Sequence, residues 1–465
     1  MIGRLSCVLL AASACAGQAY QATWESVGKH RAPAWFEDAK LGIFIHWGLY
    51  SVPAWAPPTG ELGKVDPGQW FTLNPYAEWY MNTMQIQDSP TWKHHVATYG
   101  EKFSYLDFVP AFNAGIQKWN PEVWAKIFKE TGARYVVLTS KHHDGFTLWP
   151  SRVRNPHRPA DRQGAARDLV GELTRAVRAQ GLKMGLYYSG GLDWSFLNGP
   201  IRTLEDLRNM TPQSEEYAHY ADAHWRELIE RYQPALMWND ITYPKKGDLP
   251  ALFAEYLNKV EDGAINDRFG VEFSDFTSPE YAKYDQITPK KWESCRGLGY
   301  SFGYNQVEGP EQVLPAGELI RLLVDIVSKN GNLLLNIGPK PDGGISEIQL
   351  ARLHELGQWL SVNGEGIFGS RPWVKASGKT ADGIDLRFTR KGDSLYVFLF
   401  RKPQNASVVI QSLSAAGGTK VRMLGVEGEL TWSQKDADLA ITLPARYADQ
   451  PVYALKITLA APAAR

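Results

Sequence analysis

The stretch NPEVWAKIFKETGARYVVLTSKHH, residues Asn120–His143, carries a helix signal followed at once by a strand signal. Asn120 is a favoured helix cap, Pro121 suits the first helical position, and Glu122 suits the positive end of a helix. Gly132 stands where a glycine commonly ends a helix. The run ARYVVLTS that follows is apolar and β-branched, as buried parallel strands are. The stretch therefore predicts a helix over 121–131 that leads into a buried strand ending near the two histidines.

This helix–strand unit recurs from about residue 35 to about residue 369. An apolar helical stripe over 169–177 precedes the strand-like run KMGLYYS, residues 183–189. A second stripe over 217–229 precedes ALMWND, residues 235–240. Alternating units predict an α/β fold with a parallel sheet, either open and doubly wound or closed as a (β/α) barrel. No GxGxxG or P-loop motif is present, and a length near the usual ~250 residues plus insertions favours a TIM-like barrel.

The pattern changes after about Gly369. IDLRFTRKGDSLYVFLF, residues 384–400, alternates apolar and polar positions around Lys391-Gly392-Asp393, which is a hairpin signal. Further short alternating runs follow, with few helix-like stretches between them. We predict a (β/α) barrel domain over 20–369, which carries any catalytic site, and a C-terminal antiparallel β-sandwich domain over 370–465 with a packing role.

The N-terminal residues, MIGRLSCVLLAASACAGQA, contain Arg4, an apolar run and then small residues. This is the pattern of a secretory signal peptide, and the apolar run is too short to span a membrane. We expect residues 1–19 to be removed and the mature chain to be exported, to the periplasm or as a secreted protein. Cys295 would then be the remaining cysteine, which leaves no internal disulfide and no cysteine-based zinc site.

The composition is that of an ordinary soluble globular protein. The 465 residues have a formal net charge of zero, with 44% hydrophobic and 22% charged residues. This balance gives no electrostatic reason to expect nucleic acid or an anionic membrane as a partner, and no later run resembles a membrane span. A homo-oligomer is compatible with the composition. The 17 tryptophans fit either a large aromatic core or an aromatic-lined site for a ligand such as a sugar.

Polar and aromatic side chains gather where the expected strands end. In a (β/α) barrel the functional side chains stand at the carboxyl ends of the strands. Burying so many polar groups is hard to explain by packing alone, because each must find a partner. The residues are His46-Trp47, Lys141 to Asp144, Tyr187-Tyr188 with Asp193-Trp194, Trp238 to Asp240, Asp275 with Glu280, and Trp292-Glu293.

Three kinds of site compete. A metal site is disfavoured because adjacent histidines on a strand point to opposite faces and no HExxH motif is present, and a serine nucleophile because no GxSxG motif is present. A pair of carboxylates within a shell of Trp, Tyr and His fits glycoside hydrolysis and needs no metal or other cofactor. Asp240 is the clearest first carboxylate. Spacing alone does not choose the second among Glu272, Asp275, Glu280 and Glu293.

Several longer motifs add a resemblance. IFIHWGLYSVPAW, EWY, GARYVVLTSKHHDGF, GLYYSGGLDW, MWND, SFGYN and LVDIVSKNGNLLLNIGP occur in this order between about Trp24 and about Gly369. Together they resemble the α-L-fucosidases of glycoside hydrolase family 29. The resemblance implies a retaining enzyme that removes terminal α-L-fucose from fucosylated glycans. It also implies a (β/α) barrel, often irregular, followed by a β-sandwich.

The resemblance assigns roles to single residues. Asp240 in MWND matches the family nucleophile, and INDRFGVEFSDFTSPEY makes Glu280 the acid/base, ahead of Glu272. Phe302 in SFGYN would face the C5 methyl group of fucose. The remaining fucose-holding residues would be His46, Glu78, Trp79, His142, His143, Tyr187, Trp238 and Arg268.

Two alternatives to a fucosidase remain. A glycosidase of another specificity, such as an α-L-galactosidase, would act on a sugar that differs from fucose by a hydroxyl at C6. Phe302 argues for the methyl group instead. A non-catalytic sugar-binding protein on the same fold would be expected to lack Asp240 or Glu280, and both are present.

Overall fold

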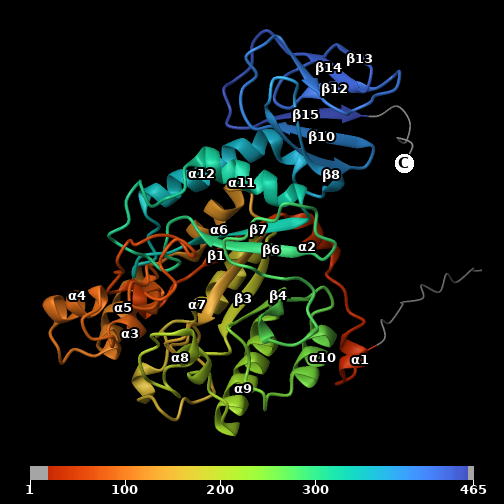
Figure 1. Ribbon diagram of the computed structural model, residues 1–465. Helices are drawn as coiled ribbons and strands as arrows, with labels where there is room; N and C mark the ends of the chain where they lie inside the picture. The colour runs from red at the N-terminus through yellow and green to blue at the C-terminus, as the bar shows by residue number, and fades with distance from the viewer. Residues whose placement is uncertain (1–18, 459–465) are drawn as a thin grey trace, which may run out of the picture.

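The computed structural model describes residues 19–458 (Figure 1). The predicted signal peptide lies outside the described residues except for its last position. A parallel sheet of seven strands forms the centre of the larger domain, in the order β5-β4-β3-β2-β1-β7-β6. Its strands are β1 (Leu41–Ile45), β2 (Tyr135–Lys141), β3 (Lys183–Ser189), β4 (Leu236–Asp240), β5 (Ala264–Ile265), β6 (Trp292–Gly297) and β7 (Gly331–Ile337).

An irregular segment lies between the two edges of this sheet. Residues 276–280 make single parallel bridges to Asn266 beyond β5 on one side and to Trp292 and Cys295 of β6 on the other. Pro279 has no N–H to donate, which helps to keep the segment from forming a regular strand. The predicted fold class is therefore confirmed, with a curled parallel sheet that forms an irregular barrel.

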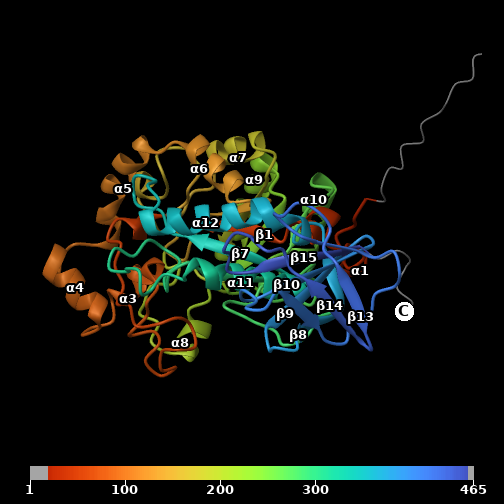
Figure 2. The same cartoon turned by 90° about the horizontal axis from the view of Figure 1, so that it is seen from above.

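Helices cover the outside of the sheet, and Figure 2 shows α6, α7 and α9 side by side along one face. The predicted cap of α6 is present, because Asn120 Oδ1 accepts a hydrogen bond from the Glu122 N–H at 2.9 Å. The helices are α1 (Trp24–Val27), α2 (Ala34–Ala39), α3 (Tyr80–Thr83), α4 (Pro90–Tyr99), α5 (Val109–Gly115), α6 (Pro121–Glu130), α7 (Leu169–Ala179), α8 (Leu204–Asn209), α9 (Glu215–Tyr232), α10 (Leu249–Lys259), α11 (Ala316–Ser328) and α12 (Glu347–Asn363). Within the described part of the chain, none of the helices has both the length and the apolar character needed to cross a membrane.

The C-terminal domain contains two antiparallel sheets that enclose a separate apolar core, so the predicted β-sandwich is confirmed. One sheet has the order β12-β15-β10-β9-β8 and the other β11-β14-β13. The strands are β8 (Arg371–Lys379), β9 (Asp385–Lys391), β10 (Ser394–Leu399), β11 (Ser407–Ile410), β12 (Lys420–Met423), β13 (Trp432–Lys435), β14 (Asp438–Thr442) and β15 (Tyr453–Thr458).

Helices α11 and α12 lie between the parallel sheet and the C-terminal domain (Figure 1). Trp359 Nε1 on α12 donates to the Val452 carbonyl at 2.9 Å, and Arg321 Nε on α11 donates to the Phe400 carbonyl at 3.1 Å. Phe398 of β10 also packs into the core of the larger domain. The two domains therefore share a packed interface, which fits a supporting role for the C-terminal domain.

Candidate active site

A pocket of about 330 Å³ opens at the carboxyl ends of the parallel strands. This is the end of a barrel at which active sites are found. All eleven predicted site residues line it: His46, Glu78, Trp79, His142, His143, Tyr187, Trp238, Asp240, Arg268, Glu280 and Phe302.

Asp240 ends β4 and is held by three donors. Its Oδ1 accepts from Arg268 Nη1 at 2.7 Å and from the Ile241 N–H at 2.9 Å, and its Oδ2 accepts from the Tyr187 hydroxyl at 2.8 Å. Burial pushes the pKa of Asp240 upward, but the Arg268 charge and the hydrogen bonds from Arg268 and Tyr187 outweigh burial and hold this pKa below its usual value. Asp240 is therefore ionised at neutral pH.

Glu280 shares its hydrogen-bond donor with Asp240. Arg268 Nη1 donates to Glu280 Oε1 at 2.8 Å as well as to Asp240 Oδ1 at 2.7 Å. The two oxygens that accept from Arg268, Asp240 Oδ1 and Glu280 Oε1, can therefore be no farther apart than the sum of these two distances. Carboxyl groups about 5–5.5 Å apart are typical of retaining glycosidases, whereas inverting enzymes separate them by about 6.5–9.5 Å to admit a water molecule.

Arg268 itself is firmly held. It lies in a short 3₁₀ turn (Asp267–Phe269), and its Nη2 donates to the Ser278 carbonyl at 2.7 Å. Its guanidinium also lies over the Trp238 ring, 4.6 Å from the centroid. These contacts fix the planar group between the two carboxylates.

The three competing carboxylates lie elsewhere. Glu272 and Asp275 line a different cavity, where Asp275 accepts from the Ile265 N–H at 2.9 Å and contacts His30 Nδ1 at 2.8 Å. Glu293 is buried beneath the pocket, where it accepts from Trp238 Nε1 at 2.9 Å and from the Tyr135 hydroxyl. Among the four candidates, Glu280 is the one that shares a donor with Asp240.

The histidines of the pocket are neutral at physiological pH. Burial lowers the pKa of His46 to about 3 and that of His143 to about 4, and it holds the pKa of His142 well below its usual value. Asn336 Nδ2 donates to the Phe302 carbonyl at 2.7 Å, so Asn336 Oδ1 accepts from Nδ1–H of His46, 2.7 Å away. The Nε2 atom of His46 is then an acceptor.

His143 has the same arrangement. The Ser189 hydroxyl donates to the Leu192 carbonyl at 2.7 Å and accepts from His143 Nδ1–H at 2.6 Å. The Nε2 atom of His143 is then also an acceptor, and it lies 3.9 Å from Asp240 Oδ2. Neutral imidazoles with acceptor nitrogens suit the hydroxyl groups of a sugar.

Strand alternation places His142 and His143 on opposite faces, yet both line the pocket. The register of β2 against β3 shifts between Thr139 and Lys141, and the regular strand ends at Lys141. A tight turn follows, with the Gly145 N–H donating to the His142 carbonyl at 3.1 Å and a positive φ of 75° at Gly145. The two rings lie 4.0 Å apart as a result.

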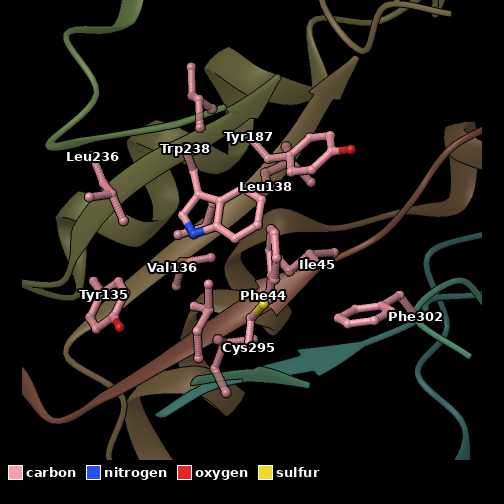
Figure 3. Packing of buried hydrophobic residues seen from close by; sticks show 14 of the residues in the cluster. Phe44, Ile45, Tyr135, Val136, Leu138, Tyr187, Leu236, Trp238, Cys295 and Phe302 are labelled. Carbon is pink, nitrogen blue, oxygen red and sulfur yellow. The ribbon is translucent and has the colours of Figure 1, made fainter. Parts of the chain in front are cut away.

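Aromatic side chains form the floor of the pocket. Figure 3 shows Trp238 and Tyr187 side by side, with Phe44 against Trp238. The Trp238 and Tyr187 rings are nearly parallel, with 24° between their planes. Glu293 thus positions Trp238 through a hydrogen bond. Trp238 in turn packs against Tyr187, whose hydroxyl donates to Asp240.

Loop residues complete the walls. Glu78, in a 3₁₀ turn (Ala77–Trp79), accepts from the Gly303 N–H at 2.7 Å, and burial raises the pKa of Glu78 to about 7. The Trp79 ring meets the His143 ring edge to face, at 5.3 Å between centroids. Phe302 is buried between Tyr76 and His46, with centroid distances of 5.4 and 4.9 Å.

Sequence reasoning missed part of the lining. Phe44 and Cys295 lie inside two of the predicted strands. Phe44 precedes His46 by two residues and Cys295 follows Glu293 by two, so the alternation of side chains along a strand could have indicated both. The outer wall lies in loops and in α8, and no motif marks it. These missed residues are Leu62, Gly63, Val65, Pro67, Trp70, Phe71, Tyr76, Leu204, Leu207 and Ile241.

Two carboxylates this close, beside neutral histidines on an aromatic floor at the end of a barrel, define a retaining glycoside hydrolase.

Over residues 19–458, no group of three or more His, Cys, Asp or Glu side chains is arranged to hold a metal ion.

Comparison with known proteins identifies the family. Residues 7–365 match the α-L-fucosidase family and residues 382–458 match the α-L-fucosidase C-terminal domain. The tissue α-L-fucosidase of Homo sapiens is 35% identical over 443 residues, covering 91% of this chain and 88% of the human protein. The chain therefore belongs to the α-L-fucosidase family.

Solved structures agree with this assignment. The structure of Thermotoga maritima α-fucosidase in complex with fucose has a TM-score of 0.86 and 45% identity, over 94% of this chain and 100% of that one. A Bacteroides thetaiotaomicron α-L-fucosidase of glycoside hydrolase family 29, trapped as a covalent intermediate with 2-fluoro-fucosyl fluoride, has a TM-score of 0.68 and 26% identity, over 92% of this chain and 97% of that one.

Proposed function

We propose that this protein hydrolyses terminal α-L-fucosides with retention of configuration, using Asp240 as nucleophile and Glu280 as acid/base. The observation that carries the proposal is the single Arg268 nitrogen that holds both carboxylates, at 2.7 and 2.8 Å. That geometry matches the close spacing of the two carboxyl groups in retaining glycosidases and suits a double displacement.

In the first step the Asp240 carboxylate attacks the anomeric carbon of fucose. The bond to the leaving oxygen breaks as Glu280 transfers its proton to that oxygen, and a covalent fucosyl–enzyme forms. In the second step Glu280 removes a proton from water, the water oxygen attacks the anomeric carbon, and the bond to Asp240 breaks. Arg268 and Tyr187 keep Asp240 ionised for the first step.

The remaining pocket residues bind the sugar. The acceptor Nε2 atoms of His46 and His143 are suited to receive hydrogen bonds from fucose hydroxyls. Trp238 presents an apolar surface to the ring, as aromatic side chains in sugar sites do. Phe302, which is 3% exposed, offers an apolar wall for the C5 methyl group.

Hydrolysis of an aryl α-L-fucoside tests the proposal, with proton NMR following the first anomer formed. We expect turnover with α-L-fucose appearing first, and we expect none from Asp240→Gly when circular dichroism shows that the variant is folded. β-L-Fucose as the first product would contradict the retaining mechanism.

Phe302 also separates fucose from L-galactose as substrate. A hydroxymethyl group in place of the methyl group would place a hydroxyl against the buried ring, without a hydrogen-bond partner there. An aryl α-L-galactoside should therefore be hydrolysed at least about tenfold more slowly than the fucoside. Equal rates would contradict the assigned place of Phe302.

We further propose that the protein is exported, supported by the signal-like pattern of residues 1–19. N-terminal sequencing of protein recovered from cell fractions tests this proposal. A mature chain that begins near residue 20 outside the cytoplasm supports export, and an intact N-terminus inside the cell contradicts it.

A further inference from the structure

We propose that the outer wall of the pocket is an apolar binding surface for the leaving group, so that α-L-fucosides with an apolar aglycone are preferred substrates. The proposal rests on the proposed function and adds a substrate class to it. The surface, here called the apolar mouth, consists of Leu62, Val65, Pro67, Leu204, Leu207 and Ile241.

The apolar mouth differs in chemistry from the floor of the pocket. Its residues come from the loop over 62–67, from α8 and from the residue after Asp240. None of its six side chains carries a charge or a hydrogen-bonding group. A leaving group that lies there can be recognised by burial of apolar surface and not by side-chain hydrogen bonds.

The exposure of two leucines indicates a surface that is not merely packed core. Leu204 is 64% exposed and Leu62 is 37% exposed, and both line the same pocket from different segments of the chain. Large exposed apolar side chains that gather at a cavity are characteristic of ligand-binding grooves.

The position of Ile241 ties the apolar mouth to the reacting atoms. Ile241 directly follows Asp240 and its N–H donates to Asp240 Oδ1 at 2.9 Å. Its φ of 68° is a left-handed conformation that is rare for a β-branched residue. Such strain is retained mainly at functional sites, and here it places an isoleucine at the pocket beside the proposed nucleophile.

The two carboxylates give the direction of the leaving group. The Glu280 side chain is 25% exposed and that of Asp240 is 10% exposed, so Glu280 lies nearer the opening. Because Glu280 protonates the leaving oxygen in the proposed mechanism, the leaving group extends from the buried fucose site toward the opening. The apolar mouth is the wall that it meets there.

A series of alkyl α-L-fucosides, from methyl through butyl to octyl, tests the proposal. Their leaving alcohols have similar acidity, so differences in kcat/KM report contact with the protein and not leaving-group chemistry. We expect kcat/KM to rise at least about tenfold from methyl to octyl, and the inhibition constant against an aryl α-L-fucoside to fall in parallel. Leu204→Gln should flatten this dependence on chain length.

Leu197→Gln is the control, because Leu197 is likewise an exposed leucine, at 37%, but does not line the pocket. It should leave the chain-length dependence unchanged. An active wild type with equal kcat/KM and equal inhibition constants along the series would overturn the apolar mouth, as would a dependence that Leu204→Gln leaves intact. A folded wild type that hydrolyses no α-L-fucoside at all, aryl or alkyl, would instead overturn the proposed function.

Discussion

Asp240 and Glu280 share one guanidinium, but they lie on regions of the barrel that differ in regularity. Asp240 ends a regular strand between β3 and β5 and has three donors around its two oxygens. Glu280 lies on the irregular segment 276–280, and its side chain is more exposed. The difference suits the two proposed roles, because a nucleophile must stay fixed and ionised whereas an acid/base must exchange protons with substrate and water.

The largest effect should come from Asp240→Gly. Loss of the nucleophile removes the covalent route, and kcat should fall by about 10⁴-fold or more on an aryl α-L-fucoside. Added azide should react from the free face of the sugar and give β-L-fucosyl azide, which NMR identifies. A folded variant with more than a few per cent of wild-type kcat would show that another residue is the nucleophile.

Glu280→Ala should have a smaller effect that depends on the substrate. The loss should reach about 10²–10⁴-fold for a disaccharide, whose leaving group needs a proton, and be weaker for an activated aryl fucoside. Azide should intercept the fucosyl–enzyme and give α-L-fucosyl azide, the anomer opposite to that from Asp240→Gly. Near-normal disaccharide hydrolysis by this variant, or the same azide anomer from both variants, would contradict the roles assigned to the two carboxylates.

Tyr187→Phe should affect Asp240 and not Glu280, because it removes one of the three hydrogen-bond donors to Asp240. A hydrogen bond to a charged group contributes about 1.5–3 kcal/mol, so kcat/KM should fall by about 10–100-fold. Because the Tyr187 hydroxyl helps to lower the pKa of Asp240, its removal should raise that pKa and shift the acidic limb of the pH–rate profile to higher pH. An unchanged acidic limb would show that the limb does not report Asp240.

Glu293→Gln should have the smallest effect on catalysis and a clear effect on stability. Burial raises the pKa of Glu293 to about 7, so the folded protein binds this proton more tightly than the unfolded chain does. The associated stability is present below pH 4.5 and is lost as pH rises toward 7, by an amount on the order of 3 kcal/mol. The difference in Tm between wild type and variant should therefore change between pH 5 and 7, and a constant difference would contradict the assigned pKa.

Much of the regular fold could be predicted from the sequence. The predicted strand over 183–189 forms β3 over the same residues, because a strand that is almost entirely buried needs a largely apolar run. The predicted helix over 121–131 forms as α6, since its cap, proline and glycine signals are all local. Asp240 could also be identified from the sequence, because it is the polar residue that ends the apolar run 235–240.

Other parts depend on contacts that sequence patterns do not encode. Segment 276–280 has no strand pattern, because bridges to both neighbours replace a regular ladder. Strand alternation places His142 and His143 on opposite faces, and the register shift before Lys141 overrides it. The choice of Glu280 came from the family resemblance, and its shared donor became visible only in three dimensions.

The apolar mouth lies beyond sequence reasoning for a related reason. Leu62 and Leu204 are 142 positions apart in the chain, in a loop and in α8. An exposed leucine taken singly is ordinary on a protein surface. The two leucines indicate a binding surface only because the fold brings both to the same pocket.

The proposed nucleophile can be identified directly by trapping the fucosyl–enzyme with a 2-fluoro-fucosyl fluoride and mapping the labelled peptide by mass spectrometry. The fluorine slows both steps and the fluoride leaves without acid catalysis, so the intermediate should accumulate. We expect one label per chain, on Asp240, and no label on Asp240→Gly. A label on Glu280, or on any other carboxylate, would contradict it.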